Sequence, residues 1–181
     1  RYADLLRDAE PSLQLHGSDD PAELAALAAR CPVWLGAPDL LAPLLRGGAR
    51  PQWVQSTWAG ITPLLADDLP RDYCLSRAVG VFGQAMAEYV LTYLLAHERQ
   101  VLARAAQHGE GVWDARTPHG LCGRRALIVG AGEIGQAVAR LLAPFGIELR
   151  GIARRPRTIE PFLEVAGIDQ LGRLAAQADY L

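Results

Sequence analysis

Short apolar runs alternate with segments of helical periodicity along this chain. Pro32 to Leu35, Trp53 to Gln55 and Ala126 to Val129 are each too short for a buried helix, which favours strands. Between the first two runs, apolar residues recur at helical spacing from Asp39 to Leu45. Strands that alternate with helices in this way predict a parallel sheet covered by helices.

Several further elements are predicted from caps and periodicity. Asp20, Pro21 and Glu23 provide an N-cap, a first-turn proline and an early acid, which together predict a helix that runs to Arg30. The segment 82–107 carries a longer apolar stripe at helical spacing and is long enough to join two domains. The remaining predicted helices are 1–10 and 169–177, and the remaining predicted strands are 13–16, 73–75, 147–153 and 179–181.

A glycine motif follows the strand that ends at Val129. Its three glycines stand between this strand and a helix-periodic stretch, and a second strand comes after that stretch. In a dinucleotide-binding turn the first glycine permits the tight turn, the second admits the pyrophosphate, and the third lets the helix pack against the strand. The helix start offers free N–H groups and the positive end of the helix dipole. The predicted cofactor-binding residues here are Gly130, Gly132, Glu133, Ile134 and Gly135, the alternative being a turn that binds no ligand.

The end of the second strand indicates which cofactor is used. An NAD enzyme places Asp or Glu there, about 20 residues beyond the motif, to bind the ribose 2′-hydroxyl. This chain has Arg154 and Arg155 instead. Guanidinium groups bind a 2′-phosphate bidentately, whereas a carboxylate would repel it. We therefore predict a preference for NADP(H) over NAD(H), with a solvated arginine cluster as the alternative interpretation.

The composition is that of a globular protein and narrows the class of ligand. Of the 181 residues, 50% are apolar and 21% are charged, which disfavours disorder and fibrous or disulfide scaffolds. The net charge of −2 gives no footprint for nucleic acid or an anionic membrane. No apolar run approaches the ~20 residues of a membrane span. Small-molecule ligands are therefore expected. All 18 basic residues are arginine, which excludes lysine-based chemistry within these residues.

Cysteine and histidine spacing predicts no metal site. Cys31, Cys74 and Cys122 are widely spaced, with no CxxC pair and no paired histidines beside them. Neither a zinc site nor a disulfide framework is therefore predicted. This cysteine usage suits a reducing cytoplasm, which is the predicted location.

Four stretches of the sequence resemble one enzyme family. They are Trp53-Val-Gln-Ser-Thr-Trp-Ala-Gly-Ile61, Gln84-Ala-Met-Ala-Glu-Tyr-Val90, Trp113, and Leu121-Cys-Gly-Arg-Arg125. With the order of the segments, they resemble the D-isomer-specific 2-hydroxyacid dehydrogenases, in particular the glyoxylate/hydroxypyruvate reductase branch. The resemblance implies an α/β chain with an incomplete flavodoxin-like substrate domain (1–82), an interdomain helix (83–108) and the first part of a Rossmann NAD(P)-binding domain (109–181).

The resemblance also implies where substrate and nicotinamide bind. Trp58, Ala59 and Gly60 match backbone amides that hold the substrate carboxylate, an arrangement in which consecutive N–H groups point at one anion. Trp58 would add an apolar wall, and Met86 matches a position near the nicotinamide. Two packing interpretations stay open: Trp58 as an aromatic packed between sheet and helix, and Met86 as a core residue.

The family's catalytic Arg, Glu and His fall beyond the position that matches Leu181. The resemblance therefore implies no catalytic residue within this chain, because all four histidines precede the glycine motif. The family's first strand is missing as well. We expect a fragment, poorly stable alone, of a protein about twice as long.

The leading hypothesis is NADPH-dependent reduction of a small 2-oxo acid, such as glyoxylate or hydroxypyruvate, to the D-2-hydroxy acid. The family implies a homodimer for the intact protein, and this chain alone is expected to bind but not to catalyse. A non-catalytic NAD(P)-binding sensor or corepressor-like module is the rival hypothesis. A formate or phosphoglycerate dehydrogenase is disfavoured by Arg154, because those enzymes usually carry the NAD-selecting acid.

Overall fold

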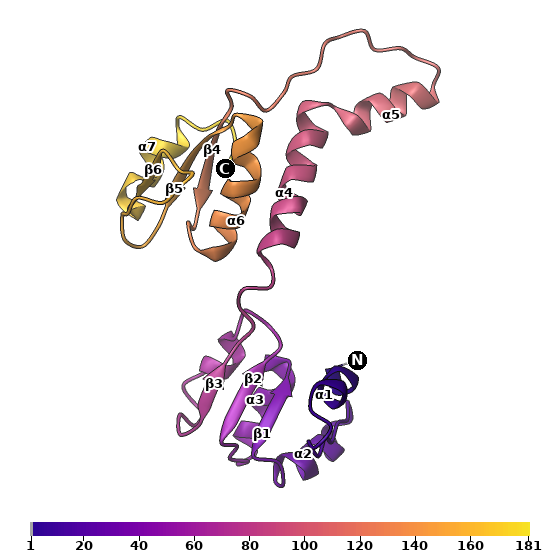
Figure 1. Cartoon of the computed structure of the whole chain (residues 1–181), viewed down its shortest axis with the longest axis vertical. Coiled ribbons are helices and arrows are strands. Elements are labelled where there is room, and N and C mark those ends of the chain that lie inside the picture. The colour runs from indigo at the N-terminus through magenta and orange to yellow at the C-terminus, as the bar shows by residue number, and fades with distance from the viewer. Residues whose placement is uncertain (1) are drawn as a thin grey trace. The chain divides into compact units, whose positions relative to one another are not determined.

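The chain folds into two units that divide between Val79 and Gly80. The computed structural model describes residues 2–181, so the predicted helix start at Arg1 lies outside the described residues. Each unit contains a three-stranded parallel sheet (Figure 1), which confirms the predicted α/β class. None of the helices in this range is long and apolar enough to cross a bilayer.

The sheet of the N-terminal unit has the order β1-β2-β3. Its strands are β1 (Val33–Gly36), β2 (Trp53–Ser56) and β3 (Cys74–Ser76), each within one residue of a predicted strand. All pairings are parallel, and Val54 in the central strand is fully buried. The short apolar runs therefore predicted these strands correctly.

One apolar cluster joins the helices of this unit to its sheet. Asp20 caps α2 (Pro21–Ala28) by accepting a hydrogen bond from the Ala22 N–H at 2.7 Å, as its sequence context predicted. Helix α3 (Pro38–Arg46) and the 3-10 helix η1 (Thr62–Leu65) also contribute buried side chains. The buried members of the cluster are Ala28, Trp34, Leu41, Ala42, Leu45, Val54, Leu64 and Leu69.

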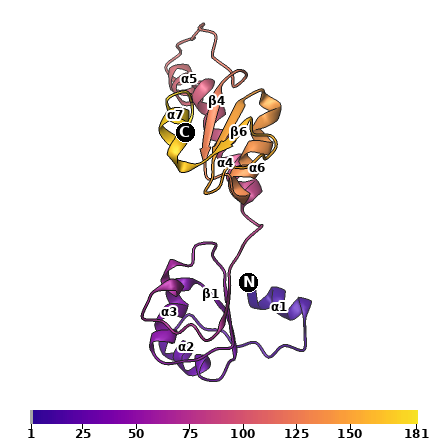
Figure 2. The same ribbon diagram turned by 90° about the vertical axis from the view of Figure 1, so that its left-hand side faces the viewer.

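The first residues of the N-terminal unit depart from the prediction. Helix α1 (Tyr2–Ala9) has no buried residue, and Figure 2 shows it at the end of an extended segment, apart from the sheet. The predicted strand at 13–16 is wrong, because these residues form neither helix nor strand. A strand needs a neighbour that satisfies its N–H and C=O groups, and a pattern of side chains does not supply one.

The sheet of the C-terminal unit has the order β4-β5-β6. Strands β4 (Arg125–Val129) and β5 (Glu148–Ile152) were predicted, whereas β6 (Glu164–Ala166) was not. The predicted strand at 179–181 is reduced to one parallel bridge between Tyr180 and Ala126, on the edge of β4 away from β5. The unpredicted β6 and the shortened strand at 179–181 have the same cause. Tertiary contacts, rather than the local sequence pattern, determine which residues pair with the sheet.

Helices cover both faces of this second sheet. Helix α6 (Glu133–Leu142) lies between the sheet and α4 (Gly83–Glu98), as Figure 1 shows. The two helices approach closely, since a Cβ on Gly83 would lie 3.0 Å from the Ala137 Cβ. On the other face, α7 (Leu171–Ala175) buries Leu174 against the sheet. The 3-10 helices η2 (Ala143–Phe145) and η3 (Ile168–Gln170) complete the unit, and η3 is the first part of the helix predicted at 169–177.

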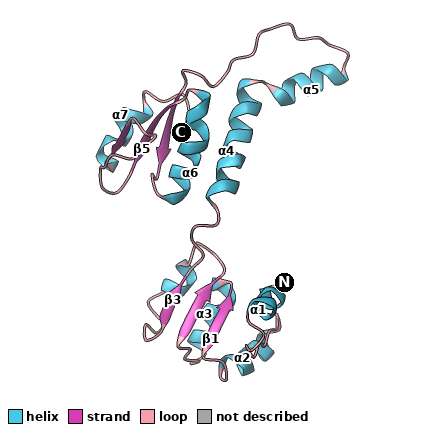
Figure 3. Cartoon of the chain, in the orientation of Figure 1, coloured by secondary structure: helices cyan, strands magenta, loops and turns pink. Residues whose placement is uncertain are grey.

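The long helix predicted over 82–107 is interrupted. Helix α4 ends at Glu98, and α5 (Val101–Gly109) begins after Gln100, whose φ of +51° is left-handed. An α-helix cannot continue through such a residue. The prediction of one interdomain helix over 83–108 is therefore wrong, because apolar periodicity does not reveal a change of direction at a single residue. Figure 3 shows α5 at an angle to α4, followed by a loop that leads to β4.

A buried carboxylate ties the end of α4 to the second sheet. Glu98 is 6% exposed and accepts hydrogen bonds from the Tyr180 hydroxyl and, at 3.0 Å, from Arg124 Nη2. The Tyr180 hydroxyl, followed by Arg124, lowers the pKa of Glu98 against the opposing effect of burial. Burial and the hydrogen bond to Glu98 raise the pKa of Tyr180 to about 12. An ionised carboxylate and a neutral phenol therefore join two segments that are distant in the sequence.

We expect Glu98→Gln to lower the free energy of unfolding by about 1–3 kcal/mol at neutral pH, because two hydrogen bonds to a charged acceptor are weakened. The folded pKa of Glu98 lies below the unfolded value of about 4.3, so its contribution is present above that value and disappears as the pH falls through the folded pKa. Urea unfolding at neutral and acid pH measures both effects. The exposed Glu148→Gln serves as a control, and equal stability of Glu98→Gln and the parent at neutral pH would contradict this role.

Candidate functional site

The glycine turn is anchored to the sheet before the chain enters α6. Gly130 has a φ of +113°, which residues with side chains rarely adopt. The N–H groups of Gly130 and Ala131 both donate to the Ile152 carbonyl at 2.9 Å. The turn is thus held at the last residue of β5, from which the segment that carries Arg154 also starts.

The other two glycines of the motif meet different constraints. A Cβ on Gly135 would lie 2.1 Å from the Gly130 carbonyl oxygen and 3.0 Å from Ile128 Cγ2. Helix α6 can therefore pack on β4 only where this position has no side chain. A Cβ on Gly132 would meet no atom within 4 Å. The space in front of Gly132 is open, as it must be where a pyrophosphate approaches the backbone.

Helix α6 presents an N-terminus without a side-chain cap. Gly132 is the N-cap residue, and no side chain in the described part of the chain accepts a hydrogen bond there. The first N–H groups of a helix have no partner inside it, so those of Glu133, Ile134 and Gly135 can bind an anion. The Glu133 carboxylate is directed elsewhere and accepts a hydrogen bond from the Gly80 N–H at 3.0 Å.

The two predicted arginines share a pocket with this turn. The pocket measures about 470 Å³. Arg154 and Arg155 are exposed, and within residues 2–181 neither forms a hydrogen bond or ion pair. Arg157 instead donates from Nη2 to the Ala131 carbonyl at 3.0 Å, which fastens the arginine segment to the turn. The lining residues are Gly130, Ala131, Gly132, Ala153, Arg154, Arg155 and Arg157.

This arrangement fits a dinucleotide cofactor. The uncapped start of α6 and the open space at Gly132 suit a pyrophosphate, and unpartnered guanidinium groups suit a second anion on the same pocket wall. A bound nicotinamide would supply the hydride chemistry. The residues of this unit would bind and orient the cofactor.

Met86 lies near the start of α4 and is 41% exposed. The interpretation of Met86 as a core residue is therefore wrong. The apolar stripe of α4 that packs against α6 uses other side chains, namely Ala87, Val90, Leu91, Leu94 and Leu95. A contact between Met86 and the nicotinamide stays a prediction.

The predicted carboxylate site lies in the N-terminal unit, directly after β2. The Trp58 N–H donates to Ser56 Oγ at 3.0 Å, and Arg77 donates to the Ala59 carbonyl at 2.6 Å. Of the three predicted amides, those of Ala59 and Gly60 have no hydrogen-bond partner among residues 2–181. Trp58 is 49% exposed, so its interpretation as an aromatic packed between sheet and helix is wrong.

Two features of the pocket between the glycine turn and the arginines, here called the nucleotide pocket, were not predicted from the sequence. Arg157 belongs to the same basic run as Arg154, but its bond to a carbonyl 26 positions away has no local signal. Gly151 lies inside β5, where a Cβ would come within 3.1 Å of Ala131 Cβ and of Phe162. A glycine inside a strand is itself a signal of close backbone approach, and it could have been used.

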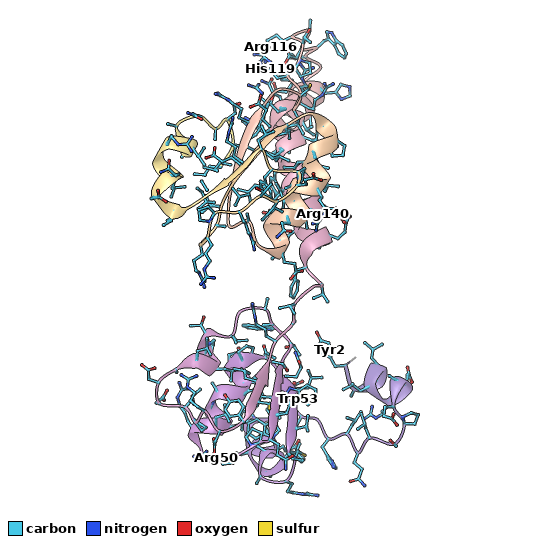
Figure 4. All side chains as sticks on the ribbon, turned by 60° about the vertical axis from the view of Figure 1, so that its left-hand side comes forward. Tyr2, Arg50, Trp53, Arg116, His119 and Arg140 are labelled. Atoms are coloured by element: carbon cyan, nitrogen blue, oxygen red, sulfur yellow. The ribbon has the colours of Figure 1, made fainter. Side chains whose placement is uncertain are left out.

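Other hollows of the C-terminal unit lie outside this pocket. Arg116 and His119, labelled in Figure 4, line a pocket of about 590 Å³ together with His97. Arg140, also labelled there, lines one of about 420 Å³ together with Glu133. No group of three or more potential metal ligands occurs in the described part of the chain.

The two glycines of the turn give a matched pair of variants. Gly132→Ala should keep the unfolding free energy within about 0.5 kcal/mol and lower dinucleotide affinity, because its Cβ meets only the space for the ligand. Gly135→Ala should cost about 1–3 kcal/mol or more of stability, because its Cβ overlaps a backbone carbonyl. Thermal unfolding and calorimetric titration with NADPH distinguish the two. Undiminished binding by Gly132→Ala would show that the pyrophosphate does not lie at this turn.

Residues 91–181 match the family described as D-isomer specific 2-hydroxyacid dehydrogenase, NAD binding domain. The glyoxylate reductase/hydroxypyruvate reductase of Mus musculus is 30% identical over 141 residues, which cover 74% of this chain and 43% of that protein. Glyoxylate/hydroxypyruvate reductase A of Serratia proteamaculans is 30% identical over 161 residues, covering 85% of this chain and 48% of that protein. The chain spans less than half the length of these two curated relatives.

Solved structures give the same assignment. A D-isomer specific 2-hydroxyacid dehydrogenase family protein from Aeromonas salmonicida matches with a TM-score of 0.91 and 34% identity, covering 98% of this chain and 58% of that one. An NADPH-dependent glyoxylate/hydroxypyruvate reductase from Sinorhizobium meliloti, solved with NADP and sulfate, matches with a TM-score of 0.76 and 27% identity, covering 98% and 56%. With its glycine turn and nucleotide pocket, the chain belongs to the D-isomer specific 2-hydroxyacid dehydrogenase family.

Proposed function

We propose that the protein reduces a small 2-oxo acid of the glyoxylate or hydroxypyruvate type to the D-2-hydroxy acid, with NADPH as the hydride donor. The observation that carries this proposal is the single pocket that joins the glycine turn to Arg154 and Arg155. Related proteins named glyoxylate/hydroxypyruvate reductases support the class of substrate.

The preference for NADPH rests on the charge at the end of β5. A carboxylate at this position would bond the ribose 2′-hydroxyl of NAD, but the chain presents two arginines there that form no hydrogen bond or ion pair within residues 2–181. A guanidinium group can donate two parallel hydrogen bonds to the oxygens of one phosphate. The Sinorhizobium meliloti relative, described as NADPH-dependent and solved with NADP, supports the same preference.

In this proposal the amides of Ala59 and Gly60 hold the substrate carboxylate. These consecutive N–H groups have no hydrogen-bond partner among residues 2–181, so both are available to a small anion. Trp58 next to them supplies an apolar surface that limits the access of water. Met86 contacts the nicotinamide ring with a soft, adaptable side chain.

Reduction of the carbonyl also needs an acid of near-neutral pKa beside the developing alkoxide. None of the site residues above is assigned the role of this acid. They bind and orient the cofactor and the substrate. Residues 2–181 would accordingly bind the cofactor without turnover. We place the protein in the cytoplasm, a reducing compartment that suits its free Cys31, Cys74 and Cys122.

We further propose a homodimer that forms through α4, α5 and the loop after them. Leu102 on α5 is 81% exposed and Trp113 in the loop is 84% exposed, and both are large apolar side chains that water solvates poorly. Tyr89 and Tyr93 on α4 contact each other with ring centroids 4.7 Å apart and ring planes tilted by 47°, and both are also exposed. Aromatic residues of this kind are enriched in protein interfaces.

Oxidation of NADPH with glyoxylate or hydroxypyruvate tests the function. We expect turnover by the intact protein with NADPH favoured over NADH, and a D-configured product. Arg154→Glu should weaken NADPH about tenfold to a hundredfold, because charge-assisted bonds are replaced by repulsion, and should leave NADH binding intact. Tight NADPH binding by the intact protein without turnover would favour the non-catalytic sensor instead.

Sedimentation velocity tests the homodimer. The parent should sediment as a dimer and Leu102→Glu as a monomer, because a charge in an apolar interface carries a large desolvation cost. Leu163→Glu is the matched control, since Leu163 is also exposed but lies next to β6. A Leu102→Glu variant that stays dimeric would place the interface elsewhere.

A further inference from the structure

We propose that Arg157 is a positioning residue of the nucleotide site, which holds the arginine segment and the glycine turn at a fixed spacing. The inference rests on the proposed function. Arg157 donates from Nη2 to the Ala131 carbonyl at 3.0 Å and lines the same pocket as Arg154 and Arg155. Unlike those two, its guanidinium already has a partner within the turn that would receive the pyrophosphate.

The carbonyl that Arg157 reaches lies at the middle of the turn. Ala131 is 1% exposed, and its oxygen also accepts a hydrogen bond from Gln136 Nε2 at 3.2 Å. Two side-chain donors therefore share one backbone oxygen, which has two lone pairs to accept them. Gln136 belongs to α6, whereas Arg157 comes from the segment after β5, so the pair fixes the turn between them.

Within residues 2–181, the backbone of the arginine segment, residues 153–157, forms hydrogen bonds at its two ends. The Ala153 N–H donates to the Ala166 carbonyl at 2.9 Å, and the Arg157 N–H donates to the Val165 carbonyl at 3.3 Å. Arg154 and Arg155 project from the stretch between these two bonds. The Ile152 carbonyl anchors the turn just before this stretch, and the Arg157 side chain adds a second link from its far end, which helps to fix the distance between the two anion subsites.

A positioning role differs in its effects from a direct contact with the 2′-phosphate. A direct contact would matter for NADPH and not for NADH. A residue that holds the turn and the segment together affects the pyrophosphate that both cofactors share. Losing one of the two donors to the Ala131 carbonyl should weaken both cofactors by a similar factor, about threefold to tenfold.

The experiment compares Arg157→Met, Arg157→Lys and Arg154→Met by calorimetric titration with NADPH and NADH, well below each melting temperature. Arg157→Met removes the donor but keeps the length of the chain, and we expect it to weaken both cofactors alike. Arg157→Lys keeps a donor and should restore most of the affinity. Arg154→Met should weaken NADPH alone, which provides the matched control.

A double-mutant cycle with Gln136→Met completes the test. Because both side chains donate to one oxygen, the combined loss of Gln136→Met and Arg157→Met should differ from the sum of the single losses. Losses that add, a loss confined to NADPH, or no loss in Arg157→Met would overturn the inference while the proposed function stands. A parent protein that binds neither cofactor would instead overturn the proposed function and this inference with it.

Discussion

The fit of α6 against β4 at Gly135 is the contact on which the nucleotide unit depends. The helix approaches so closely that a single methyl group would overlap the Gly130 carbonyl. This approach brings the start of α6 next to the end of β4, and it leaves the first N–H groups of the helix in front of the open space at Gly132. The same helix contacts α4 on its outer side, where a Cβ on Gly83 would lie 3.0 Å from the Ala137 Cβ. Small residues thus determine the spacing of three layers.

Polar groups in this unit are satisfied across long sequence separations. Glu98 joins α4 to Tyr180 and Arg124, and Asp179 accepts hydrogen bonds from the Arg125 side chain and N–H. These bonds hold the last described residues against β4, where local strand pairing contributes one bridge. Side-chain hydrogen bonds therefore reinforce the edge of β4, where backbone pairing is limited to one bridge.

The sequence predicted most elements of both sheets because short apolar runs and glycine punctuation are local signals. Val33–Gly36, Trp53–Ser56 and Arg125–Val129 lie within one residue of their predicted bounds. Strand β6 and the change of direction at Gln100 had no such signal: one depends on pairing with β5, and the other on a single backbone angle. For the site, the glycine and arginine positions could be named from the sequence. The hydrogen bond from the Arg157 side chain to the Ala131 carbonyl could not be predicted, because the two residues are 26 positions apart and meet only in the folded chain.

The Ile152 carbonyl accepts the N–H groups of both Gly130 and Ala131 and stands immediately before the arginine segment. One oxygen atom is therefore the common reference point for both halves of the pocket. If the function proposed above is correct, this pocket would distinguish ligands by the separation of their anionic groups, and a mononucleotide would reach only one of the two anion subsites.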